Sequence, residues 1–151
     1  MLGCFVPNHR CIDNAIHTYA GVQLRLECDK LMREQNHPEE TGKAKITNGY
    51  NLPAGHVLHT VGPIIYGSVT EEDVRLLESC YRECLDLAWN HGLRQVVFCC
   101  ISTGEFHFPN VLAARTAVAT VREWRRGREE MRVIFNVFKD EDLVIYEREL
   151  G

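Results

Sequence analysis

The sequence lacks the features that mark several specialised classes of protein. No apolar run reaches the roughly 18 residues that a membrane-spanning helix needs. Its 17 Lys and Arg residues are outnumbered by 21 Asp and Glu residues, so the chain has no global basic surface for nucleic acid or an anionic membrane. The first residues also lack the basic-then-apolar order of a signal peptide. We therefore expect a cytoplasmic protein that binds neither nucleic acid nor membrane.

The cysteine content does not favour a disulfide framework. The chain has seven cysteines, an odd number. Cys99 and Cys100 lie inside an apolar, strand-like run, where we expect them to pack as small hydrophobic residues. The remaining cysteines are then available for a metal ion or for burial.

The composition is that of a single globular domain spanning 1–151. Hydrophobic residues make up 45% of the 151 residues and charged residues 25%, enough to bury a core. We find no internal repeat and no linker.

Hydrophobic periodicity predicts an α/β fold. Helical spacing predicts helices over 12–35, 71–91, 110–125 and 140–150, the last one capped by Asp140. Apolar β-like runs predict strands over 44–47, 56–61, 95–100 and 131–138. Because strands alternate with helices, the sheet should be mixed and largely parallel between helical layers. We expect the last two strands to be buried, 95–100 on both faces.

Cys4, His9 and Cys11 lie within eight residues, directly before the first predicted helix. Two thiolates and one imidazole can converge on a zinc ion and leave a fourth position for water or substrate. A reduced loop with thiols near a histidine has the same spacing. The spacing alone does not decide between these two interpretations.

Asp13 and Asn14 follow at the expected helix start. Both residue types are preferred N-caps. A helix N-terminus also attracts anions, and a carboxylate beside a metal can orient or deprotonate a water molecule. Spacing favours the capping role.

The loop between the third predicted strand and the third helix contains Ser102, Thr103, Gly104, Glu105 and Phe106. Ligands of open α/β sheets bind beyond the carboxyl ends of the strands, where hydroxyls and backbone amides near a glycine can cradle phosphates. Phe106 could stack on a sugar. An ordinary strand-to-helix connection would have the same composition. We interpret His17 and His59, by contrast, as satisfied core or boundary histidines.

Three separated motifs resemble those of zinc-containing macrodomains, the microbial protein-ADP-ribose hydrolases often encoded beside sirtuin-like ADP-ribosyltransferases. The first motif spans 2–17 and continues to Ala20 and Gly21. The second combines 41–47, 51–53 and 59–63, and the third, similar to a diphosphate loop, spans 101–109. The resemblance extends from Leu2 to Leu150.

This resemblance implies a three-layer α/β/α macrodomain-like sandwich and a set of site residues. The zinc (Zn2+) ligands would be Cys4, His9 and Cys11. The residues beside the metal would be Cys11, Ile12, Asp13 and Asn14, with Asp13 as the catalytic acidic residue near the terminal ribose. The diphosphate and adjoining ribose would be held by Ser102, Thr103, Gly104, Glu105 and Phe106. The implied partner is ADP-ribose or a mono-ADP-ribosylated protein, with a functional link to a sirtuin-like ADP-ribosyltransferase.

Family members carry strands before this point, an Asn-rich segment upstream of Leu2 and an aspartate that contacts adenine, and the sequence has none of these. We therefore expect the C-terminal portion of a macrodomain that lacks the first strands. Two other functions stay open beside hydrolysis. One is a reader that binds ADP-ribose without cleaving it, and the other is a structural remnant in which zinc pins the N-terminal loop.

Overall fold

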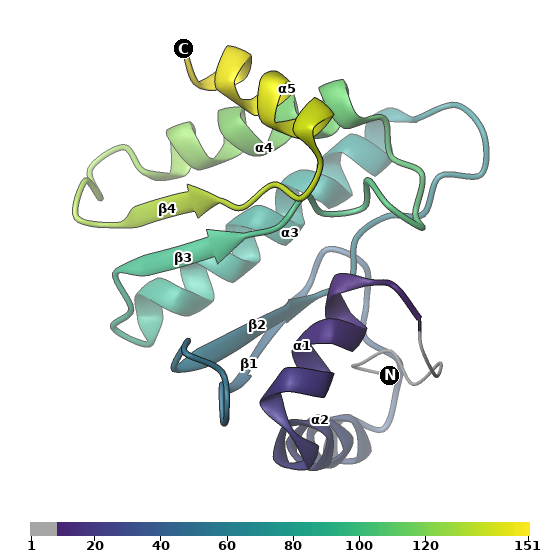
Figure 1. Ribbon diagram of the computed structural model, residues 1–151, viewed down its shortest axis with the longest axis vertical. Coiled ribbons are helices and arrows are strands. Elements are labelled where there is room, and N and C mark those ends of the chain that lie inside the picture. Colours follow the sequence, from purple (N-terminus) through teal and green to yellow (C-terminus); the bar gives the residue numbers. More distant parts are fainter. Residues whose placement is uncertain (1–8) are drawn as a thin grey trace. The chain divides into compact units, whose positions relative to one another are not determined.

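The computed structural model describes residues 9–151, which fall into two compact units. Of the described residues, unit 1 contains 9–40 and Lys45–His59, and unit 2 contains Thr41–Ala44 and Thr60–Gly151. Figure 1 shows the helices and strands of both units. That 1–151 forms one domain stays a prediction.

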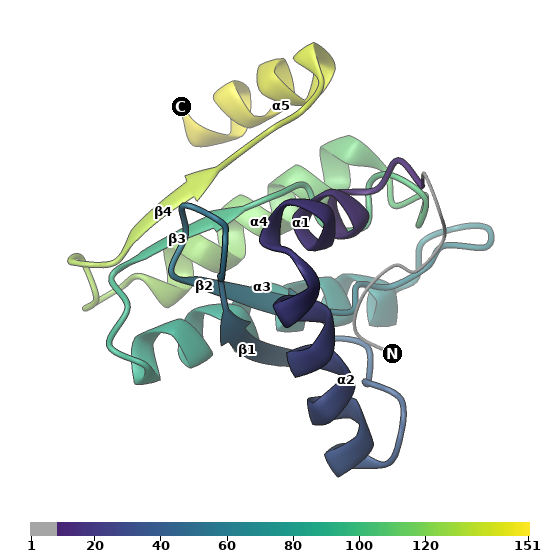
Figure 2. The same ribbon diagram turned by 60° about the horizontal axis from the view of Figure 1, so that its bottom comes forward.

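Two helices of unit 1 replace the single helix predicted over 12–35. Helix α1 spans Ile12–Ala20 and α2 spans Val22–Gln35, with Gly21 between them at φ 92°. Glycine tolerates this conformation, whereas a residue with a Cβ rarely does. The chain changes direction between α1 and α2 (Figure 2). The prediction was wrong here because the apolar period continues across the break.

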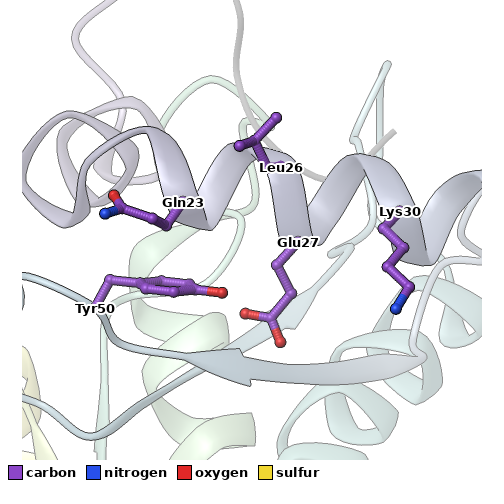
Figure 3. A pocket seen from close by; sticks show the side chains of 5 residues that line it. All are labelled: Gln23, Leu26, Glu27, Lys30 and Tyr50. Carbon is purple, nitrogen blue, oxygen red and sulfur yellow. The ribbon is translucent and has the colours of Figure 1, made fainter.

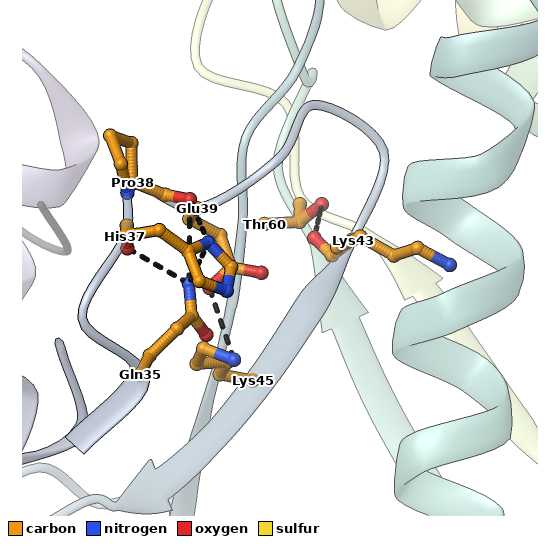
Figure 4. A network of polar contacts seen from close by, with 7 residues as sticks. All are labelled: Gln35, His37, Pro38, Glu39, Lys43, Lys45 and Thr60. Carbon is orange, nitrogen blue, oxygen red and sulfur yellow. Dashed lines mark hydrogen bonds and ion pairs between the residues drawn. The ribbon is translucent and has the colours of Figure 1, made fainter.

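Polar contacts hold the segment that follows α2 (Figure 4). The Gln35 side-chain amide donates to the carbonyl oxygens of His37 and Pro38 at 3.1 and 3.4 Å. The Lys45 ammonium lies 3.1 Å from the buried carboxylate of Glu39. These contacts fix the turn that leads from α2 into the first strand.

The first two predicted strands are confirmed. Strand β1 spans Ala44–Asn48 and β2 spans His56–Thr60, and the two form a two-stranded sheet. The Gly49 amide donates to the Gly55 carbonyl at 2.9 Å and closes the connection between them. Strands joined by so short a connection pair antiparallel.

Unit 1 has a small hydrophobic core beneath its two helices. It is formed by Ala20, Leu24, Cys28 and Val57, with Ile16, Met32 and Leu52 packed against it. Leu24 and Cys28 lie one turn apart on α2, so one face of that helix supplies most of the contact. The opposite face of α2, which carries the largely exposed Leu26, does not contribute.

Helix α3 opens the helical part of unit 2 and spans Glu71–Asn90, close to the predicted 71–91. Its N-terminus is a capping box: the Thr70 amide donates to the Asp73 carboxylate at 2.8 Å, and the Asp73 amide donates to the Thr70 hydroxyl at 3.2 Å. Two backbone donors that the helix itself cannot satisfy are thereby paired.

The remaining strands form a parallel pair in unit 2. Strand β3 spans Gln95–Phe98 and β4 spans Arg132–Phe135, in register from Gln95 opposite Arg132 to Phe98 opposite Phe135. Helix α4, Asn110–Trp124, lies between them in the chain, as predicted. Parallel strands need such a crossover connection. Figure 1 shows the two strands side by side.

Both strands of this pair are shorter and more exposed than predicted. Cys99 and Cys100 follow the end of β3 and lie outside it. Burial alternates along β3, and Val97 is 56% exposed, so the strand is not covered on both faces. Strand β4 is only partly buried. The apolar runs predicted longer strands because they continue beyond the paired residues.

Aromatic packing joins the elements of unit 2. Helix α4 packs against α3 and against α5, Asp140–Leu150. The ring centroids of Tyr81 and Phe98 lie 4.9 Å apart, and those of Phe135 and Tyr146 lie 5.0 Å apart.

The N-cap of α5 differs from the prediction. Lys139, not Asp140, is the N-cap residue, so the predicted cap was wrong. The three-layer α/β/α arrangement around a mixed, largely parallel sheet stays a prediction, and so does the absence of the first strands.

Free thiols are found at Cys28, Cys80, Cys84, Cys99 and Cys100. Within residues 9–151, the helices are all too short or too polar to cross a membrane.

Candidate functional site

The start of α1 positions the first group of predicted site residues. Cys11 is the N-cap residue, and its Sγ accepts a hydrogen bond from the Asn14 amide at 3.4 Å. The prediction that Asp13 or Asn14 caps this helix was therefore wrong. Asp13 lies in the first turn, and its side chain is 39% exposed. Its carboxylate thus stands at the positive end of the helix dipole, where negative charge is favoured.

The predicted zinc ligands are only partly described. His9 and Cys11 are half-buried, whereas Cys4 lies outside the described residues. The sulfur of Cys11 suits a soft or borderline metal ion, and the helix N-terminus favours negative charge on it. The donor chemistry of the two described residues fits zinc, and the complete ligand set stays a prediction.

A polar cluster lies inside unit 1 behind α1. His17 and His59 are 1% and 6% exposed, which confirms the prediction that they are core histidines. The His59 Nε2 lies 2.9 Å from the Thr47 Oγ1 and 3.8 Å from the Cys28 Sγ. The Asp13 Oδ1 lies 3.7 Å from the His17 Nε2. The cluster therefore extends from the core to the carboxylate at the start of α1.

Burial keeps this cluster neutral. It lowers the pKa of His59 to about 4 and raises the pKa of the Cys28 thiol to about 11. It also lowers the pKa of His17, against the opposing effect of the Asp13 carboxylate. Desolvation penalises the charged form of each group, so both imidazoles and the thiol are uncharged near neutral pH.

The second predicted group lies in unit 2, in the loop between β3 and α4. Backbone hydrogen bonds fold this loop on itself: the Phe108 amide donates to the Ser102 carbonyl, and the His107 amide donates to the Gly104 carbonyl, both at 3.0 Å. Ser102 and His107 have positive φ values of 65° and 57°. Such a backbone is unusual for residues with side chains and recurs at ligand sites.

Ser102 also carries a buried hydroxyl. Its Oγ has no hydrogen-bond partner within residues 9–151. A Cβ placed on Gly62 would collide with this oxygen, so the observed position of the Ser102 hydroxyl requires glycine there. Buried hydroxyls are normally paired, and a bound ligand is one way to pair this one. Gly62 was not among the predicted site residues.

The remaining residues of the loop leave its outer side open. The Thr103 hydroxyl donates to the Cys100 carbonyl at 3.1 Å, and the Ile65 amide donates to the Phe106 carbonyl at 2.9 Å. Gly104 and Glu105 are exposed, and a Cβ on Gly104 would meet nothing within 4 Å. The loop is thus anchored on its inner side while its tip is accessible.

A surface hollow of about 450 Å³ lies elsewhere in unit 1 (Figure 3). It is lined by Gln23, Leu26, Glu27, Lys30 and Tyr50, which come from α2 and the turn after β1. None of the predicted site residues lines it. Its glutamate is already engaged, because Glu27 accepts a hydrogen bond from the Asn48 amide at 3.0 Å.

Asp13 belongs to unit 1 and the Ser102 loop belongs to unit 2. The structure therefore describes the two halves of the predicted site separately. That they bind one ligand together stays a prediction, as do the individual roles of these residues.

Comparison with known proteins identifies a family and a set of relatives. The family model described as Macro domain matches residues 3–117. A protein-ADP-ribose hydrolase of Treponema medium is 52% identical over 149 residues, which is 98% of this chain and 57% of the relative. The ADP-ribose glycohydrolase MACROD1 of Rattus norvegicus is 49% identical over 92% of this chain and 53% of its own length. The chain thus spans little more than half the length of these curated relatives.

Solved structures agree with this result. The Oceanobacillus iheyensis macrodomain with ADP superposes with a TM-score of 0.88 at 31% identity, covering 94% of this chain and 75% of that one. The Trypanosoma brucei macrodomain in complex with ADP-ribose gives a TM-score of 0.84 at 35% identity, covering 99% and 59%. These similarities confirm the α/β fold predicted for the chain.

Proposed function

Since the chain belongs to the Macro domain family, we propose that it removes ADP-ribose from mono-ADP-ribosylated proteins. The bond cleaved is that between the terminal ribose C1 and a protein side chain. The observation that carries the proposal is the 52% identity, over 98% of the chain, to a protein-ADP-ribose hydrolase. Because the chain covers 57% of that relative, both the activity and the substrate belong to the proposal.

The Ser102 loop supports the binding half of this function. It follows the carboxyl end of β3, and its hydroxyls and backbone amides suit a diphosphate. The buried Ser102 hydroxyl would pair with the ligand, and Phe106 would lie against the adjoining ribose. Binding energy from the diphosphate then positions a distant sugar for reaction.

The start of α1 supports the chemical half. Because Cys11 caps the helix, the carboxylate of Asp13 is not needed for that role. We assign it the orientation or activation of the attacking water, which adds a hydroxyl group to C1 as the side chain leaves. Ile12 and Asn14 would border the sugar, and Ile12 is 49% exposed.

A zinc ion would be held by Cys4, His9 and Cys11. In such a three-ligand site zinc can bind ribose hydroxyls or the modified side chain, or lower the pKa of a bound water to about 7. Cys11 and Asp13 are two residues apart, so the ion would lie beside the proposed water-activating carboxylate. The proposed zinc site is supported by the imidazole of His9 and the thiol of Cys11, since both groups are common zinc ligands.

The direct test is release of ADP-ribose from a mono-ADP-ribosylated protein. We expect Asp13→Asn to lower kcat by about 10²- to 10⁴-fold with little change in ADP-ribose affinity. Asp29→Asn, which neutralises an exposed carboxylate on α2, is the matched control and should retain full turnover. Calorimetry with ADP-ribose separates binding from catalysis.

Metal analysis tests the zinc site in the same proteins. Cys11→Ala should lose one zinc ion per chain, that of the Cys4–Cys11 loop, together with turnover. If the wild-type chain binds ADP-ribose but releases none from a modified protein, it is a reader and not a hydrolase. If chelation lowers stability but leaves affinity and turnover unchanged, zinc is only structural.

A further inference from the structure

Three donor side chains that are not part of the predicted zinc loop meet inside unit 1. His17 comes from α1, Cys28 from α2 and His59 from β2. One ligand atom of each lies within 4.8 Å of the ligand atoms of the other two. Segments up to 42 positions apart in the sequence therefore bring two imidazoles and one thiol together.

The spacing of these donors is close to that around a metal ion. Bonds of 2.0–2.3 Å, as zinc forms with nitrogen and sulfur, place tetrahedral ligands about 3.3–3.8 Å apart. The Cys28 Sγ and the His59 Nε2 are already 3.8 Å apart. The His17 donor lies within 4.8 Å of the other two donors, so a bound ion requires it to move closer by at most about 1 Å.

Neighbouring polar groups suit the outer shell of such a site. Histidines that bind metals usually contact a carboxylate or another acceptor through the second ring nitrogen. The Asp13 Oδ1 lies 3.7 Å from the His17 Nε2. The Thr47 hydroxyl lies 2.9 Å from the His59 Nε2 and would border a bound ion.

Apolar residues seal the cluster. Ala20, Leu24 and Val57 form the core of unit 1 together with Cys28. All three donors are less than 7% exposed. An ion without access for substrate serves structure and not catalysis.

We propose that His17, Cys28 and His59 bind one soft or borderline divalent cation inside unit 1, and that this ion is Zn²⁺ in the cell. The ion displaces the proton of the Cys28 thiol, which passes to solvent, and both imidazoles bind in their neutral form. The burial that keeps all three groups neutral also keeps water from the bound ion. This site is separate from the ion expected at Cys4, His9 and Cys11 and does not depend on the proposed hydrolase function.

Cobalt titration of the reduced, full-length chain tests the site. The substitutions Cys4→Ala and Cys11→Ala first remove the two thiols of the loop. We expect this double variant to bind one Co²⁺ per chain, with the absorption of a single thiolate ligand. Adding Cys28→Ala should abolish that absorption, whereas adding Cys84→Ala, a buried cysteine of α3, should leave it unchanged.

Two results would overturn the proposal: a double variant that binds no cobalt through sulfur, or absorption that persists after Cys28→Ala. If the Cys28 variant does not fold, X-ray absorption of the zinc-loaded double variant decides instead. One sulfur and two imidazoles around zinc support the site, and a shell of oxygens only refutes it. These experiments do not measure turnover. Their outcome therefore stays valid even if the chain has no hydrolase activity.

Discussion

The interiors of the two units differ in chemistry. Unit 2 is filled with large apolar side chains, of which Leu77, Phe108 and Met131 are at most 1% exposed. Unit 1 buries His17 and His59 as well as its aliphatic residues. Apolar contacts do not respond to protons or metal ions, whereas imidazoles respond to both. The stability of unit 1 should therefore depend on buried imidazoles, whereas the histidines of unit 2, His91 and His107, are exposed.

The largest expected effect is on the apolar interior. Leu77→Ala removes a fully buried side chain of α3 and should lower the free energy of unfolding of unit 2 by about 2–5 kcal/mol. Leu143→Ala, at a position 45% exposed on α5, removes the same atoms and should cost less than about 0.5 kcal/mol. Both tryptophans, Trp89 and Trp124, belong to unit 2, so their fluorescence in urea measures this unit. Equal effects of the two substitutions would contradict the comparison.

Acid should act on unit 1 through His59. Burial lowers the pKa of His59 from 6.5 to about 4, so the unfolded chain binds this proton first as the pH falls. The neutral imidazole contributes stability above pH 6.5, and this is lost progressively down to pH 4, by up to about 3 kcal/mol. Hydrogen exchange of β2 amides in metal-free protein measures the loss.

The control for this prediction lies on the same strand. His59→Gln should flatten the dependence of β2 exchange on pH, whereas substitution of the exposed His56 by Gln should not. An unchanged slope in the His59 variant would show that other groups cause the acid sensitivity of unit 1.

A smaller effect is expected on the affinity for ADP-ribose when the Ser102 loop, and not another part of unit 2, is disturbed. Gly62→Ala places a methyl group against the Ser102 Oγ, which forces the Ser102 side chain or its loop to shift and should weaken ADP-ribose binding about tenfold, or about 1.4 kcal/mol. Gly67→Ala is the matched control, because a Cβ there meets nothing within 4 Å. Calorimetry on both variants gives the difference in Kd. Equal affinities would show that the Ser102 loop does not bind the ligand.

The smallest effect concerns the capping box of α3. Thr70→Ala should lower the stability of unit 2 by about 1 kcal/mol. Hydrogen bonds from Thr70 also lower the pKa of Asp73, so the capping contribution is present at neutral pH and is lost as the pH falls through that pKa. The cost of Thr70→Ala should therefore shrink in acid. Ser68→Ala, just outside the helix, should cost nothing at either pH in urea unfolding followed by fluorescence.

Most helices could be predicted from the sequence because their local signals agree. For α3, the apolar period from Val74 to Ala88 and the glycine at position 92 together predict bounds close to the observed ones. The signals conflicted at Gly21, where the period continues through a glycine whose left-handed backbone ends one helix. They were also insufficient at Cys99 and Cys100, because a strand ends where its pairing stops and not where its apolar residues stop.

Some features of the candidate site could likewise be predicted from the sequence, and others could not. Asp13 and the Ser102 loop could be proposed from the sequence because each lies within a short motif. The close approach of Gly62 to Ser102 could not, since it joins residues 40 positions apart. Likewise, His17 and His59 were identified as core residues, but their proximity to Cys28 depends on how α1, α2 and β2 pack.

The sulfur cap on α1 has a consequence for metal exchange. Because the Cys11 Sγ already accepts the Asn14 amide, this helix keeps its first turn whether or not an ion is bound at the sulfur. A thiolate has lone pairs enough for both partners. If the proposed zinc ion binds at Cys11, it can therefore leave and return without unravelling the helix that carries Asp13, and loss of the ion need not be followed by refolding.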